Sequence, residues 1–66
     1  MNYSREMNKR IDDMVETITE MDLSAGELER IAEKHEHATT DVGIIIHTAA
    51  MLVSVRMIFN EAKETV

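Results

Sequence analysis

The histidines are the side chains of this sequence best suited to chemistry, and His35 and His37 stand close together, followed by Asp41. On a helix, residues two apart point in different directions, so His35 and His37 cannot hold one metal ion together. His37 shares a helix face with Asp41, four residues later, and with Glu33, four residues earlier. Two ligands do not complete a metal site. We therefore interpret this segment as polar surface and expect no metal and no cofactor.

Two further polar side chains, His47 and Arg56, lie inside a long apolar stretch. A buried histidine must find a hydrogen-bond partner, so we expect His47 to be paired at an interface. Its alternative role is to make that interface sensitive to pH. Arg56 either extends its charge to solvent or pairs with an acidic residue of the first helix, such as Glu20 or Asp22. Its alternative role is to anchor an interface.

No pattern in the sequence predicts catalysis. The chain has no cysteine, no glycine-rich phosphate loop, and no nucleophile and base at a recognisable spacing. The sequence therefore predicts a protein that is not an enzyme.

The chain is acidic, with 13 acidic and 7 basic residues and a formal net charge of −6. This charge argues against direct binding to a nucleic-acid backbone and against an anionic membrane surface, because both attract lysine and arginine. The acidity favours solubility or a basic protein partner.

With 66 residues, no proline and only one Phe and one Tyr, the sequence predicts a single small all-α domain, residues 1–66. Met7, Ile11, Met14, Ile18 and Met21 follow steps of four and three residues, which predicts an amphipathic helix over about 4–21. Ser24 and Glu27 form a capping box that starts a second helix at about residue 25. We expect this helix to continue to about residue 63; the alternative is a break near 38–41, with Thr39, Thr40 or Asp41 capping a new helix.

The segment 42–59 is the most unusual part of the composition, because 13 of its 18 residues are apolar on almost every side of the helix. Such a helix must be surrounded by other protein, and the first helix can cover at most one and a half of its apolar rows. We therefore expect the helical hairpin to assemble into an oligomeric bundle, a dimer or tetramer. The expected interface is centred on Ile46, Ala49, Ala50, Val53 and Met57, with Leu52, Phe59 and Arg56 beside it.

A membrane span is a second explanation of the same stretch, since a span needs about 20 apolar residues. His47 and Arg56 argue against it, as does the absence of flanking tryptophans and of a basic cluster. The polar N-terminal residues predict no signal peptide. We expect a cytoplasmic protein and regard a small single-span membrane protein as an alternative.

Ala38, the run Ile45-Ile46-His47 and Ala50, after a short turn and an amphipathic helix, resemble the small helical-hairpin co-chaperones of type III secretion needle subunits. The resemblance covers roughly fifteen residues, and the short turn and the apolar residues beyond Leu52 depart from it. It implies a small chaperone that shields a client helix. From the residues themselves we expect a helical protein–protein interaction module, a homo-oligomeric regulator, inhibitor or adaptor that binds itself and another protein.

Overall fold

The structure is a computed structural model that describes residues 4–64, and within this range the chain is all helical. It forms three helices, α1 (Arg5–Glu20), α2 (Ala25–Lys34) and α3 (Asp41–Glu64). The all-α prediction is therefore confirmed for the described residues. α3 is the longest of the three, with 24 residues, and at about 1.5 Å per residue it is about 36 Å long. This length accounts for the longest extent of the molecule, 38 Å.

α1 begins where Ser4 caps it, with the Ser4 hydroxyl accepting a hydrogen bond from the Met7 N–H at 3.1 Å. The apolar seam predicted for this helix is the face that packs inward: its members Ile11 and Ile18 are buried, together with the adjacent Val15. Met21, which ends the predicted seam, is exposed because α1 has already finished.

The turn between α1 and α2 is short and is closed by the predicted cap. Asp22 adopts the left-handed conformation with φ 52° and redirects the chain. The Ser24 hydroxyl then accepts from the Glu27 N–H at 3.2 Å, which is the first half of a capping box. The second half differs from the prediction, because the Glu27 carboxylate accepts from the Ser24 hydroxyl at 3.3 Å rather than from the backbone.

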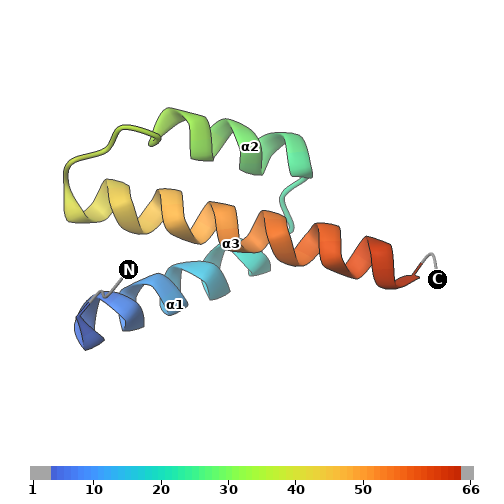
Figure 1. The fold of residues 1–66 in the computed structure, drawn as a ribbon, viewed down its shortest axis with the longest axis horizontal. Helices are drawn as coiled ribbons and strands as arrows, with labels where there is room; N and C mark the ends of the chain where they lie inside the picture. Colours follow the sequence, from blue (N-terminus) through green and yellow to red (C-terminus); the bar gives the residue numbers. More distant parts are fainter. Residues whose placement is uncertain (1–3, 65–66) are drawn as a thin grey trace.

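The prediction of one continuous helix over 25–63 is wrong, because α2 ends at Lys34 and α3 begins at Asp41. Thr40 explains the restart: its hydroxyl accepts from the Gly43 N–H at 3.2 Å, which is N-cap geometry. The alternative break, predicted near 38–41, is what the chain adopts, with the non-helical segment starting a few residues earlier. The break reverses the chain, so α2 lies antiparallel to α3 (Figure 1).

α3 is the centre of the fold, because both α1 and α2 pack against it, whereas the backbones of α1 and α2 do not approach each other closely in the described residues. One buried cluster joins the three helices at Ile11, Val15, Ile18, Leu28, Ile45, Ala49 and Val53. The C-terminal end of α3 extends beyond the ends of α1 and α2 (Figure 1). The fold therefore holds α3 firmly along one side and leaves much of its length uncovered.

Candidate interaction surface

The residues expected at the centre of an oligomer interface lie largely inside the single chain. Ala49 and Ala50 are 0% exposed and Val53 is 7% exposed. Ile46 and Met57 are half-buried, and Met57 packs against the buried cluster. In this conformation the centre of the expected interface is covered by α1 and α2.

A different surface of α3 remains open, and we call it the outer seam. It consists of the half-buried Ile44 and Thr48 and the exposed Met51, Val55, Ile58 and Ala62, widened by the exposed Leu52 and Phe59. Its members follow one another at steps of four, three, four, three and four residues, which is a heptad pattern. The large side chains from Met51 to Phe59 on this seam are between 42% and 68% exposed. Contiguous exposed apolar surface of this kind marks an interaction site more often than a scattered apolar residue does.

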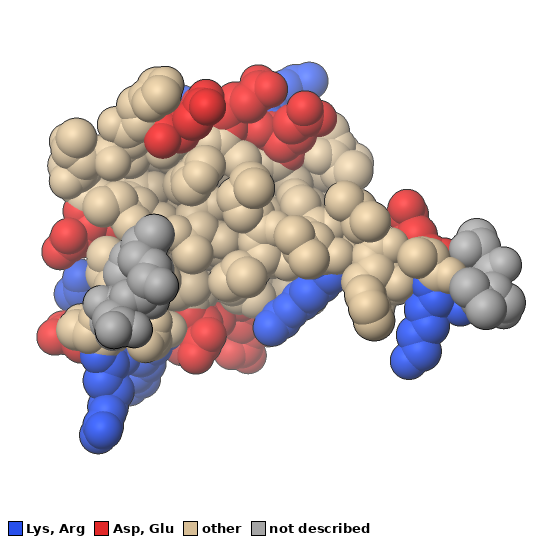
Figure 2. Space-filling view, viewed as in Figure 1, with Lys and Arg blue, Asp and Glu red and all other residues tan. Residues whose placement is uncertain are grey.

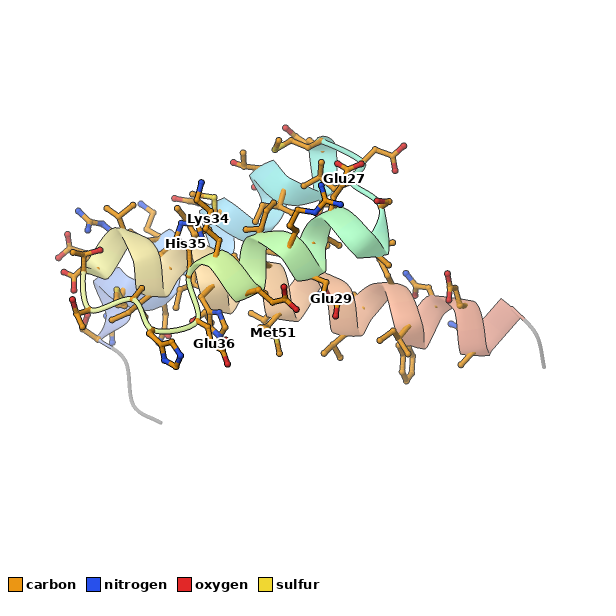
Figure 3. The ribbon with its side chains drawn as sticks, turned by 90° about the horizontal axis from the view of Figure 1, so that it is seen from above. Glu27, Glu29, Lys34, His35, Glu36 and Met51 are labelled. Carbon is orange, nitrogen blue, oxygen red and sulfur yellow. The ribbon has the colours of Figure 1, made fainter. Side chains whose placement is uncertain are left out.

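One edge of the outer seam is acidic. A groove of about 560 Å³ runs between α2 and α3, with Met51 and Ile58 among its apolar lining residues. Its wall carries Glu29 and Glu33 of α2 and Glu36 of the segment that follows α2. Seen from above, Glu29, Glu36 and Met51 lie on the same side of the molecule, whereas Glu27 and Lys34 point to the other side (Figure 3). The row of carboxylates therefore belongs to the groove.

The opposite edge of the outer seam is basic. The basic residues of α3 are Arg56 and Lys63, and both are exposed. The space-filling view shows an uncharged band along α3, with acidic side chains above it over α2 and basic side chains below its C-terminal half (Figure 2). The outer seam is therefore an apolar strip with carboxylates on one edge and cations on the other.

His47 connects two helices through its ring. Its Nδ1 lies 2.9 Å from the carbonyl oxygen of Ala32, so it joins α3 to the last turn of α2. A carbonyl oxygen only accepts hydrogen bonds, so Nδ1 is the donor, and it keeps this proton in the neutral and the charged ring alike. His47 therefore has a hydrogen-bond partner within its own chain, whereas its expected place at an interface between chains stays a prediction. Its role as a pH-sensitive residue stays a prediction, and this hydrogen bond does not depend on the charge of the ring.

The other chemically suited residues are not brought together. His35 places its own Nδ1 3.0 Å from the Ile31 carbonyl oxygen, within one turn of the same helix. Among residues 4–64, no group of three His, Cys, Asp or Glu side chains is arranged to hold a metal ion. The described part of the chain thus offers an apolar surface with charged edges as its candidate site.

No protein-family model, no curated protein and no solved structure matches this chain. Within the described residues, one helix, α3 over Asp41–Lys63, is long and apolar enough to cross a membrane, and 28% of its most apolar window is buried in the fold. What the fold defines is a small all-α protein whose central helix has one covered and one uncovered side.

Proposed function

We propose that this protein is a non-enzymatic helical interaction module that assembles with a second copy of itself through the outer seam. The observation that carries the proposal is the exposure of the heptad pattern on α3, from Met51 to Phe59. A heptad repeat of apolar residues pairs best with another apolar helix. A second copy of the chain supplies such a helix, because its own α3 carries the same outer seam.

The free energy available from covering the outer seam supports this assignment. Removing one large apolar side chain from water contributes about 1.5–3 kcal/mol. Five such side chains, each already partly buried, lie on the seam of each copy. Their combined burial is comparable with the estimated cost of association, about 4–15 kcal/mol. A dimer that covers the outer seams of both copies is therefore energetically reasonable, whereas burial of a single seam residue would not offset the cost of association.

The distribution of charge also suits self-assembly. Residues 42–66, which contain all of α3 except Asp41, carry two basic and two acidic groups and are neutral, although the chain has a net charge of −6. The excess of acidic groups lies in residues 1–41, which contribute α1 and α2. Two copies that meet through α3 bring their neutral surfaces together and keep most of their acidic groups in solvent, where salt screens them.

Val55→Glu is expected to convert the oligomer to a monomer, because it places a charge at the middle of the seam, where burial without a partner is costly. Light scattering after gel filtration measures the mass. Val42→Glu is the matched control: Val42 is 63% exposed, close to the 59% of Val55, but lies off the outer seam. It should leave the mass of the wild-type oligomer unchanged. A wild-type chain that stays monomeric at every concentration would overturn the proposal.

A single-span membrane protein is the second candidate, favoured by the length and composition of α3. Insertion of α3 would remove Ala49 and Val53 from their contacts with Leu28 and with α1, so the buried cluster would be lost. Flotation with lipid vesicles separates the two candidates, because the interaction module stays in the aqueous fraction without detergent. Vesicle-bound protein that needs detergent to leave the lipid would support the membrane candidate.

A further inference from the structure

The geometry points to a parallel dimer in which the edge formed by Leu52, Arg56 and Phe59 of each copy lies in the groove between α2 and α3 of the other. This inference rests on the proposed self-assembly and specifies its direction and its contacts. It commits to a second copy of this chain as the occupant of the groove. The argument depends on the two edges of the outer seam.

The two edges carry complementary chemistry. The groove edge has three carboxylates, on Glu29, Glu33 and Glu36, next to apolar residues of α3. The opposite edge carries the cation of Arg56 between the exposed side chains of Leu52 and Phe59. A surface with apolar side chains and a cation fits a groove with an apolar floor and an acidic wall. Each copy has one of each.

Only one relative direction of the helices joins these edges. If two outer seams meet face to face with the α3 helices antiparallel, both α2 helices lie on the same side, so carboxylates face carboxylates and Arg56 faces Arg56. If the α3 helices are parallel, the two-fold axis runs along them and places α2 of one copy beside the Arg56 edge of the other. Opposite charges then meet twice, once on each side of the axis. Pairing of opposite charges and avoidance of like charges both favour the parallel dimer.

The level of the charges along α3 agrees with this arrangement. In a parallel pair in register, equivalent residues lie side by side, so Arg56 of one copy lies at the height of residue 56 of the other. Ser54 and Ile58, two residues before and two residues after this level, line the groove together with Glu29. The Arg56 guanidinium of one copy is therefore at the correct height to meet the Glu29 carboxylate of the other.

Single cysteines test the direction directly, because the natural chain has no cysteine. Thr48→Cys and Ile58→Cys place a thiol at two seam positions about 15 Å apart along the helix. In the parallel dimer each variant meets its own copy, so mild oxidation should convert both to disulfide-linked dimers. An antiparallel dimer can link at most one of them. His37→Cys, in the exposed segment before α3, controls for linkage by random collision and should remain unlinked.

Charge exchange tests the predicted contact. Arg56→Glu should weaken the dimer roughly tenfold, since the contact occurs twice in a symmetric pair. Glu29→Lys should weaken it by a similar factor, and the double variant should return most of the lost affinity, as measured by analytical ultracentrifugation. Glu27→Gln is the control on α2, because Glu27 points away from the groove (Figure 3) and glutamine can keep the place of Glu27 in the capping box. It should leave the dissociation constant unchanged.

The outcomes separate this inference from the proposed function. Linkage of both cysteine variants together with recovery in the double charge variant supports the parallel dimer. A wild-type dimer in which only one cysteine variant links, or in which the double variant is no better than the single variants, overturns the inference and leaves self-assembly intact. A wild-type monomer overturns both.

Discussion

Leu28→Ala is expected to lower the free energy of unfolding by roughly 2–5 kcal/mol, the usual cost of removing a buried leucine side chain. Leu28 is 0% exposed and belongs to the cluster that includes Ile11 and Val15 of α1 and Ile45 and Ala49 of α3. Leu28 is the larger of the two buried side chains of α2, the other being Ala32, so it is the main apolar link from α2 to the rest of the fold.

The size of the chain makes this loss severe. A domain of 66 residues has a total stability of about 3–10 kcal/mol, so one cavity at Leu28 removes much of it. Urea denaturation followed by circular dichroism measures the change. Met21→Ala is the matched control, because Met21 is apolar and exposed and lies off the outer seam. It should change the stability by less than about 0.5 kcal/mol. If Leu28→Ala costs no more than Met21→Ala, α2 is not held against α3 as described.

Local signals predict the starts of the helices well. Ser24 with Glu27 marks the start of α2, and the hydroxyl bond is found there. Thr40 stands among the residues predicted to cap a new helix if the chain breaks, and it caps α3. The break itself is harder to predict, because the helical propensities of His35 to Thr39 differ too little to decide between a continuous helix and a turn. The packing of α2 back onto α3 decides it, and packing is not visible in local sequence.

The break between α2 and α3 also explains why the candidate site lies on a different side of α3 from the predicted interface. With a continuous second helix, α1 alone would cover α3, and Ala49, Ala50 and Val53 would remain for a partner. Once the chain reverses at 35–40, α2 covers α3 as well, and these small residues allow close approach within one chain. The uncovered surface then moves to the other side of α3, where Met51 and Val55 lie. The sequence identifies the excess of apolar surface on α3, whereas the side on which it lies depends on tertiary packing.

Substitution of Gly43 is expected to have the second large effect on stability, and it tests whether the chain reverses at 35–40. Gly43 is buried in the first turn of α3, and a Cβ there would lie 2.5 Å from the Ala38 Cβ and 3.2 Å from the Thr40 Oγ1. The Ala38 Cβ is attached directly to the backbone, so it cannot move aside without moving the segment. We expect Gly43→Ala to lower the stability by about 1–3 kcal/mol, the cost of overpacking, in spite of its better helix propensity.

Gly26→Ala is the control for this prediction, since a Cβ at Gly26 would meet nothing within 4 Å. There the better helix propensity of alanine acts alone, so the variant should gain up to about 1 kcal/mol. Ala38→Gly removes the carbon that Gly43→Ala would strike. Residues 38 and 43 come close only because the chain reverses at 35–40. The double variant, Ala38→Gly with Gly43→Ala, should therefore lose less free energy of unfolding than the two single variants lose together. Strict additivity in urea denaturation would mean that the 35–40 segment does not lie against the first turn of α3, and the antiparallel packing of α2 that depends on this reversal would lose its support.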